Sequence, residues 1–299
     1  MVDVGLQQRS LKSVPPVRAE FVVQNVAAGR AETVEQPLPL AARLWNLGWL
    51  RKMLILAVLA AAWEIYARYI HNPLLFPTFF DTVAAFWNGM VHGPLLMRAL
   101  TSIRILVLGY ATGLVLAAVF VTFAISTRIG TDLISTLTAM FNPLPAIALL
   151  PLALLWFGLS TFSIIFVIIH SVLWAVSLNM HTGFLSVSPT LRMAGQNCGL
   201  RGVAYVVKLL IPAAFPSILT GLKIGWAFAW RTQVGAELVF GMTTNSGGLG
   251  WFIFENRNLL ETASVFAGLM TVIIVGLVVE GVIFRTIEQK TVRRWGMLR

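Results

Sequence analysis

Six apolar runs long enough to cross a lipid bilayer constrain the fold of this chain more than any other feature. A membrane-spanning helix needs about 20 largely apolar residues. The six candidates are Met53–Ile70, Ile103–Ile125, Leu133–Phe157, Phe162–Met180, Ala213–Gly241 and Ala263–Phe284. With 58% hydrophobic and only 11% charged residues, a water-soluble fold could not keep so much apolar surface from water. The sequence therefore predicts an all-α polytopic membrane protein with six transmembrane helices.

The third apolar run is interrupted by Pro143, Pro145 and Pro151. Each proline removes a backbone donor and disfavours helix at the preceding residue. Non-helical backbone at membrane depth is tolerated only where protein or a water-filled cavity surrounds it. We expect this segment to be broken and buried inside the bundle.

Basic residues indicate the orientation of the spans. If the N-terminus is cytoplasmic, most Lys and Arg residues fall on the cytoplasmic side, while the external loops hold only Arg98 and Arg257. Arg68 lies at the outer end of the first span, where we expect it to pair with Glu64, and near the end of the last span we expect Glu280 to pair with Arg285. This bias predicts that both termini are cytoplasmic. The net charge of +10 is therefore a topology signal, and we expect no nucleic-acid partner.

Two regions are expected along the chain. Residues 1–48 form a proline-containing cytoplasmic tail that ends in an amphipathic helix, Leu38–Leu50, at the membrane surface. Residues 49–299 form the transmembrane domain. The external stretch after the fifth span carries a Gly-rich turn, Thr244–Gly250.

The sequence has none of the motifs expected of an enzyme or a cofactor-binding protein. It contains no Walker A loop, no HExxH and no paired CxxC, and its single cysteine is Cys198. We therefore expect no catalytic residues, no metal and no cofactor bound by this chain. Energy for transport would come from an ion gradient or from a partner protein.

The long cytoplasmic loop between the fourth and fifth spans carries the most informative local pattern. Pro189 can open a short helix, and Gly199 can end it at the C-cap. A second helix is expected to run to Pro212, where the next segment begins. A short surface helix of this kind can insert into a partner's groove, or it can be an ordinary connection.

This loop, residues 187–212, resembles the "EAA" loop of ABC importer permeases. Ala194, Gly199 and Pro212 match the family pattern, whereas Met193 replaces its glutamate and Gly195 its second alanine. The resemblance implies that the loop docks on an ATP-binding subunit. The residues expected to couple to it are Pro189, Leu191, Arg192, Met193, Ala194, Gly195, Gly199 and Pro212.

The resemblance extends over about Asn72 to Arg294, with a family-like core at about 95–285. The elements that carry it are Phe76-Pro77-Thr78, Asn142-Pro143-Leu144-Pro145, Trp156-Phe157-Gly158-Leu159, Gly235-Ala236-Glu237-Leu238 and Gly248-Leu249-Gly250. They are most similar to the nitrate, sulfonate, taurine and bicarbonate branch. The resemblance implies a multi-pass permease of the bacterial inner membrane that imports a small anionic solute.

The resemblance also implies the partners. Two permease copies would form one pathway through the membrane lipid, and two cytoplasmic ATPase subunits would hold ATP and Mg²⁺. A solute-binding protein would deliver the small-molecule substrate at the outer face.

Polar and aromatic residues on two spans are candidates for the substrate pathway, because polar side chains at membrane depth usually face a cavity or the bundle interior. His170 and Trp174 share one face of the fourth span. On the fifth span, the residues that share a face are Trp226, Trp230, Gln233 and Glu237, with Arg231 to one side. Interhelical hydrogen bonding is the alternative role for these residues.

Two other functions are compatible with the residues alone. An ion-gradient-driven secondary transporter would place its site near the broken third span and would need no second subunit. A membrane protein without transport activity, such as an assembly scaffold, would use the same polar residues for helix packing.

Overall fold

The computed structural model describes residues 46–240 and 247–296. The chain divides into two compact units, residues 1–56 and Ala57–Arg299. Of the first unit, the described part holds the first turns of one helix, so most of the predicted interfacial helix Leu38–Leu50 lies outside the described residues. The same is true of residues 241–246, which begin the predicted Gly-rich turn.

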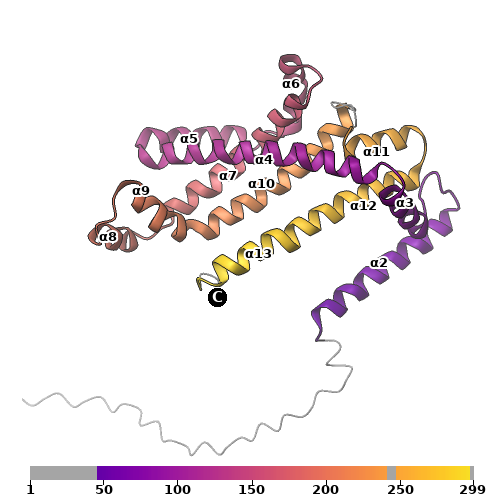
Figure 1. Ribbon diagram of the computed structural model, residues 1–299, viewed down its shortest axis with the longest axis horizontal. Coiled ribbons are helices and arrows are strands. Elements are labelled where there is room, and N and C mark those ends of the chain that lie inside the picture. Colours follow the sequence, from indigo (N-terminus) through magenta and orange to yellow (C-terminus); the bar gives the residue numbers. More distant parts are fainter. Residues whose placement is uncertain (1–45, 241–246, 297–299) are drawn as a thin grey trace, which may run out of the picture. The chain divides into compact units, whose positions relative to one another are not determined.

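The described chain is entirely helical, which confirms the predicted fold class (Figure 1). The elements up to the cytoplasmic loop are α2 (Gly48–Ile70), α3 (Phe79–Val91), α4 (Leu95–Ser126), α5 (Arg128–Phe141), η1 (Ala146–Leu149), α6 (Leu150–Phe157) and α7 (Thr161–Leu185). The later elements are α8 (Pro189–Asn197), α9 (Gly202–Tyr205), η2 (Val206–Leu210), α10 (Ile211–Phe240), α11 (Leu249–Asn258), α12 (Thr262–Val278), η3 (Val279–Phe284), α13 (Arg285–Glu288) and η4 (Gln289–Arg293).

Among the described residues, five helical stretches are long and apolar enough to cross a membrane, and one bent pair brings the number to six. The five are Gly48–Ile70, Leu95–Ser126, Thr161–Leu185, Val206–Val239 and Thr262–Arg293. The predicted spans are therefore present, but the helices extend beyond the apolar runs at most of their ends. Apolar composition marks the part of a helix that suits lipid, whereas backbone hydrogen bonding continues into polar turns.

The expected helix boundary at Pro212 is wrong. The helix runs through this position, because the preceding turn, Val206–Leu210, is a π-helix in which the Ile211 N–H bonds to the Val206 carbonyl. A π-turn changes the hydrogen-bond register locally, so a following proline can be accommodated without ending the helix. Pro216 also lies inside α10.

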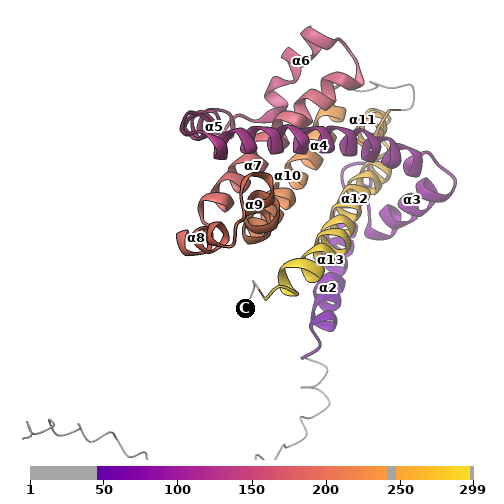
Figure 2. The same cartoon turned by 60° about the vertical axis from the view of Figure 1, so that its left-hand side comes forward.

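The predicted break in the third span is confirmed, since Arg128–Phe141 and Ala146–Phe157 meet at 87°. The expectation that this segment is buried is wrong for the single chain. Leu150 and Ala153 are buried, but Leu155 is 80% exposed and Trp156 is 56% exposed. In both views α6 projects beyond the other helices (Figures 1 and 2), and Leu150 and Ala153 are its residues in the buried core.

The core of the second unit is formed mainly by α4, α7 and α10, which pack against one another, with α4 crossing the other two in Figure 2. Glycines let α4 approach α7 closely. A Cβ atom at Gly109 would lie 2.8 Å from Ile168, and one at Gly113 would lie 2.9 Å from Val172. Both distances are too short for real atoms, so these glycines permit the close contact that their small-xxx-small spacing predicts.

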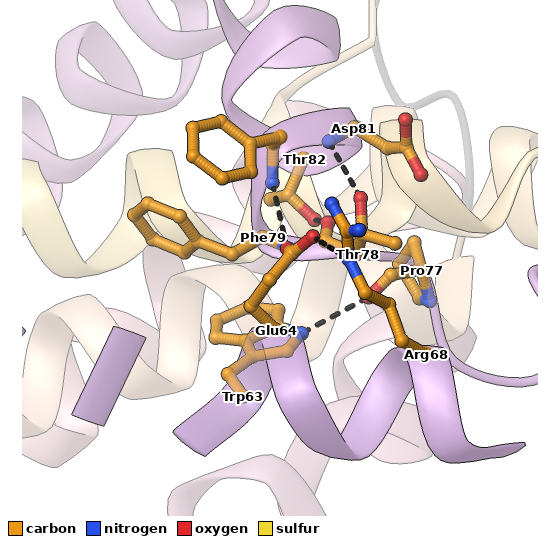
Figure 3. Close-up of polar contacts among 9 residues, drawn as sticks. Trp63, Glu64, Arg68, Pro77, Thr78, Phe79, Asp81 and Thr82 are labelled. Atoms are coloured by element: carbon orange, nitrogen blue, oxygen red, sulfur yellow. Dashed lines mark hydrogen bonds and ion pairs between the residues drawn. The ribbon is translucent and has the colours of Figure 1, made fainter. Parts of the chain in front are cut away.

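Polar contacts join the end of α2 to the start of α3 (Figure 3). One oxygen of the Glu64 carboxylate pairs with Arg68 at 2.7 Å, as predicted, and the other accepts the Phe79 N–H at 2.9 Å. The expected Glu280–Arg285 pair is not among the ion pairs of the described residues. The indole of Trp63 donates to the Pro77 carbonyl at 3.0 Å. A carboxylate at a helix N-terminus satisfies free backbone donors. This cluster therefore holds the start of α3 against the end of α2.

Candidate functional site

A cavity of about 310 Å³ opens between the broken segment, α7 and α10. Its lining consists of Phe141, Asn142, Pro143, Leu144, Pro145, Ala146, Ile147, His170, Ser171, Trp174, Phe228, Arg231 and Thr232. We call it the Arg231 pocket. It exists because the prolines after α5 end that helix and leave a non-helical turn against α7 and α10.

Arg231 is the one charged residue in this lining. Its guanidinium lies 5.3 Å from the centre of the Phe228 ring, a cation–π arrangement. Its Nε donates to the Ala227 carbonyl at 3.0 Å. The side chain is exposed within the single chain, so its terminal amino groups remain accessible to an anion.

Two aromatic residues of α7, His170 and Trp174, also line this pocket. Trp174 stacks on Phe141 with ring centres 5.0 Å apart and an angle of 16° between the planes. His170 meets both rings edge to face. The indole nitrogen of Trp174 and both ring nitrogens of His170 are buried without a hydrogen-bond partner among the described residues. Buried polar groups almost always have partners, so the packing of the described residues leaves these three nitrogens unsatisfied, and their burial keeps them out of contact with the open cavity.

A second cavity of about 350 Å³ lies between α10 and the helical stretch from α12 to η3. Trp226 and Trp230 line it together with Arg231, which therefore borders both cavities. The indole N–H of Trp230 donates a hydrogen bond to the Val272 carbonyl at 3.2 Å. Lys223, at one end of this cavity, pairs with Glu288 at 2.5 Å.

Glu237 lies in neither cavity and is 1% exposed. Its carboxylate accepts the Gly250 N–H at 2.8 Å and lies 2.7 and 2.8 Å from the Ser102 hydroxyl. The side-chain amide of Gln233 is a third donor. The Ser102 hydroxyl in turn accepts the Leu249 N–H at 2.8 Å. We call these groups the Glu237 hub, which joins α4, α10 and the N-terminus of α11.

The glycines around the turn make room for this carboxylate. A Cβ atom at Gly248 would overlap the Glu237 carboxyl group, and one at Gly250 would lie 2.6 Å from the Glu237 Cβ and from the Val234 carbonyl oxygen. Only glycine lets the backbone approach a buried side chain so closely. The close packing against Glu237 therefore explains why glycine occupies both ends of the motif Gly248-Leu249-Gly250.

The structure divides the predicted pathway residues among three places. His170, Trp174 and Arg231 meet in the Arg231 pocket, Trp226 and Trp230 line the second cavity, and Gln233 and Glu237 form the hub. The sequence reasoning missed Phe228, Ser171 and Thr232 in the pocket and Ser102 in the hub. A helical projection of α10 around Arg231 would have indicated Phe228 and Thr232, whereas Ser102 is too far away in sequence to be found.

The predicted coupling helix is present as α8, with both expected boundaries. Ser188 caps its start by accepting the Leu191 N–H at 3.3 Å, and Pro189 occupies its first turn. Gly199 ends it with a φ of +80°. The Gly199 N–H bonds to the Gln196 carbonyl and the Leu200 N–H to the Gly195 carbonyl, which is a Schellman motif.

Arg192 fastens this helix to the end of α7. Its guanidinium donates to the carbonyls of Val187 at 3.1 Å and Phe184 at 2.5 Å. These carbonyls lie at and just beyond the C-terminus of α7, where helical partners run out. Leu191 and Met193 point outward and are 43% and 56% exposed.

Gly195 lets α8 pack closely against the next helix. Gly195 is buried, and a Cβ atom there would overlap Leu209 of η2. Ala194 is exposed on α8. The outward surface of α8 therefore carries Leu191, Met193 and Ala194, whereas Arg192 and Gly195 face the rest of the chain.

Within the described part of the chain, no group of three or more His, Cys, Asp or Glu side chains could hold a metal ion. The two cavities likewise combine aromatic walls with few polar groups. The arrangement can bind or pass a small solute.

Residues 109–292 match the family model described as "binding-protein-dependent transport system inner membrane component". The chain is 32% identical to a putative ABC transporter permease protein of Methanocaldococcus jannaschii over 240 residues, which cover 77% of this chain and 86% of the relative. It is 27% identical to a putative aliphatic sulfonates transport permease protein of Bacillus subtilis, covering 82% and 88% of the two chains.

A third relative is the nitrate import permease protein of a Synechocystis species, at 28% identity over 70% of this chain and 72% of the relative. The sequence resemblance to the sulfonate and nitrate branch is therefore confirmed. The family's permease is not itself an enzyme, because the ATPase of such a system is a separate subunit. Together, the helical fold, the α8 loop and these matches establish that the chain belongs to the inner-membrane permease family of binding-protein-dependent ABC transporters.

Proposed function

We propose that this permease imports a small anionic solute and that the Arg231 pocket is part of its path. The observation that carries this proposal is the charge of the pocket, whose described lining contains one arginine and no acidic residue. A lone positive charge in a concave, largely apolar site favours an anion over a cation. The sulfonate and nitrate names of two relatives support the same class of solute.

The proposed assembly contains two copies of this chain, two ATPase subunits that bind ATP and Mg²⁺, and a solute-binding protein. The exposed apolar surface of α6, where Leu155 is 80% and Trp156 56% exposed, supports a second copy. Residues 49–299 would form the permease domain and residues 1–48 a separate cytoplasmic tail.

The proposed docking site for the ATPase is α8, with the loop 187–212 as the coupling element. Leu191 and Met193 would enter a groove of the ATPase, while Arg192 keeps the helix attached to α7. The family glutamate is replaced by Met193, so the contact at this position would be apolar.

The transport proposal is tested by ATP-driven uptake into proteoliposomes that contain the permease, its ATPase and its binding protein. Radiolabelled taurine, methanesulfonate, nitrate and bicarbonate serve as anionic probes, and choline serves as the cationic probe. We expect uptake of at least one anion, dependent on ATP and abolished without the ATPase. Uptake of choline alone, or full uptake without ATP, would contradict the proposal.

The docking proposal is tested at Gly199, whose positive φ is unfavourable for a β-branched residue. We expect Gly199→Val to distort the end of α8 and reduce ATP-driven uptake while the protein inserts normally. Gly199→Asn is the matched control, since asparagine tolerates this conformation. If Gly199→Val transports as well as the control, α8 is not the coupling helix.

A further inference from the structure

Arg231 also borders the second cavity, which contains a further positive charge. The described lining of this cavity holds two cationic side chains, Arg231 and Lys223, and one carboxylate, Glu280. Along α10, Lys223 lies eight residues, or about 12 Å of helix, nearer than Arg231 to the loop 187–212. An anion that leaves Arg231 toward the cytoplasmic side would therefore meet Lys223 as the next positive charge of this lining.

Lys223 already has a carboxylate partner. Its Nζ lies 2.5 Å from Oε2 of Glu288 on α13, and Nε of Arg293 lies 4.0 Å from the other carboxylate oxygen. The side chains of Lys223 and Glu288 are 35% and 24% exposed, so the pair is accessible to a small solute. A carboxylate and an anionic solute would compete for the same ammonium group.

The segment that carries Glu288 is held on α10 without the help of this ion pair. Phe284 and Val292 are 6% and 1% exposed, and they share a buried apolar cluster with Leu219 of α10. Partly exposed ion pairs add little to the stability of a fold. The position of this segment therefore depends mainly on apolar packing, and the pair can break without releasing it.

The two carboxylates beside the cavity lie on a stretch of unusual helical geometry. Glu288 belongs to α13, a single α-helical turn with the π-helical turns η3 and η4 on either side. Glu280 belongs to the first of these π-turns. Because π-turns are rare and occur frequently at functional sites, this part of the last helical stretch is a candidate for a role in transport.

A transport path must release its solute as well as bind it. Sites along such a path have to be weak enough for the solute to leave, and two cations beside one cavity would retain an anion. We infer that Lys223 is a second anion contact after Arg231, and that Glu288 displaces the anion from Lys223 and so releases it to the cytoplasmic side. This inference rests on the proposed anion import and adds a release step to it.

Uptake kinetics in the complete proteoliposome system test the role of Lys223. The probe is whichever of radiolabelled methanesulfonate, taurine, nitrate and bicarbonate the unaltered system imports fastest. We expect Lys223→Gln to lower the maximal uptake rate about tenfold or more, while KM changes less than about twofold because the binding protein and Arg231 still receive the solute. A normal maximal rate in Lys223→Gln would overturn the inference.

Exchanging the two charges separates release from packing. Lys223→Glu combined with Glu288→Lys places an ion pair across the same two positions, so we expect an unfolding temperature within about 3 °C of that of the unaltered protein. Uptake should remain about tenfold low or lower, because the anion would meet a carboxylate on α10. Recovery of uptake together with the unfolding temperature would show that the pair is structural and would overturn the inference.

Glu288→Gln tests the displacement step. Without the carboxylate, Lys223 would keep the anion longer, so probe anion preloaded inside the vesicles should inhibit uptake at least about threefold more strongly than in the unaltered protein. A purely structural role would not change this sensitivity. Equal inhibition in the variant and the unaltered protein would overturn the role of Glu288.

Two control variants remove a positive charge elsewhere. Lys290 of η4 is exposed and forms none of the ion pairs found in the described part of the chain. Arg104 of α4 is exposed and lines neither cavity. We expect Lys290→Gln and Arg104→Gln to import at the normal maximal rate, and an equal loss in these controls and in Lys223→Gln would overturn the assignment of Lys223.

The uptake experiments separate this inference from the proposed function. If anion uptake depends on ATP and on Arg231 but is unaffected by Lys223→Gln and Glu288→Gln, anion import stands and the release step fails. If the complete system imports choline and no anion, both proposals fail.

Discussion

Two ionisable residues on the same helix, α10, differ sharply in burial and in hydrogen bonding. Glu237 is 1% exposed and surrounded by donors from three helices, namely the Gly250 N–H, the Ser102 hydroxyl and the Gln233 amide. Arg231 is exposed, borders two cavities, and makes a single hydrogen bond within its own helix.

Under the proposed function, this difference favours Arg231 over Glu237 as the charge that contacts the solute. The bonding capacity of Glu237 is used to hold the start of α11 against α4 and α10, so it has little left for a passing solute. Among the described residues Arg231 makes no hydrogen bond to a second helix, so under the proposed function its terminal amino groups are left for the solute. A charged residue in a spanning helix is therefore a functional candidate only after its hydrogen bonds within the fold are counted.

The largest expected effect on stability is that of Glu237→Leu. This change leaves the donors of Ser102, Gln233 and Gly250 buried without an acceptor, and we expect a loss of about 3–5 kcal/mol in the free energy of unfolding. Thermal unfolding in detergent, followed by size-exclusion chromatography, measures it. Glu237→Gln keeps one acceptor oxygen and should be less damaging; equal stability of Glu237→Leu and the unaltered protein would refute the hub.

Gly250→Ala is expected to have the next largest effect. The added methyl group would meet the Val234 carbonyl oxygen at 2.6 Å, and a backbone atom cannot move as easily as the end of a side chain. We expect about 2–3 kcal/mol of destabilisation in the same unfolding assay. Gly276→Ala on α12 is the control, because its methyl group would meet its nearest neighbour only at 3.9 Å.

A pair of serine substitutions compares the two regions directly. Ser102→Ala removes the acceptor of the Leu249 N–H and one donor to Glu237, so we expect a loss of about 1–2 kcal/mol. Ser171→Ala lies in the Arg231 pocket and removes only a bond to the Ile168 carbonyl in its own helix. Its stability should change by less than about 0.5 kcal/mol. A larger loss of stability for Ser171→Ala than for Ser102→Ala would show that the Glu237 hub is not the part of the molecule that stabilises the fold.

The smallest effect on stability is expected for Arg231→Gln, at less than about 0.5 kcal/mol, because the side chain is exposed and holds no second helix. The expected effect of this variant on uptake is large. Loss of a charged hydrogen-bond donor, worth about 1.5–3 kcal/mol, should reduce anion uptake about 10- to 100-fold. A large drop in unfolding temperature for this variant would show that Arg231 is structural.

Much of the fold was predictable because lipid imposes simple rules. Apolar runs located the spans, prolines located the break at Phe141–Ala146, and Pro189 and Gly199 bounded α8. The continuous helix through Pro212 was not predictable, since it depends on a π-turn before the proline that no residue type requires.

The site was predictable only in part. Shared helical faces grouped Glu237 with Trp226 and Trp230, but a helix in a bundle has different neighbours along its length, so one face can border a cavity at one turn and a hub at another. The decisive partner of Glu237 is Ser102, a contact between segments 135 residues apart. Arg231 lay beside the predicted stripe, and only the position of the broken segment brings it together with His170 and Trp174.

The proposal that Arg231 serves transport while Glu237 serves the fold is tested most directly by ATP-driven anion uptake per folded transporter. The measurement compares Arg231→Gln with Arg104→Gln in proteoliposomes. The account predicts that Arg231→Gln assembles and melts like the unaltered protein yet imports about 10- to 100-fold less anion, while Arg104→Gln imports normally. Normal uptake per folded transporter in Arg231→Gln would contradict it.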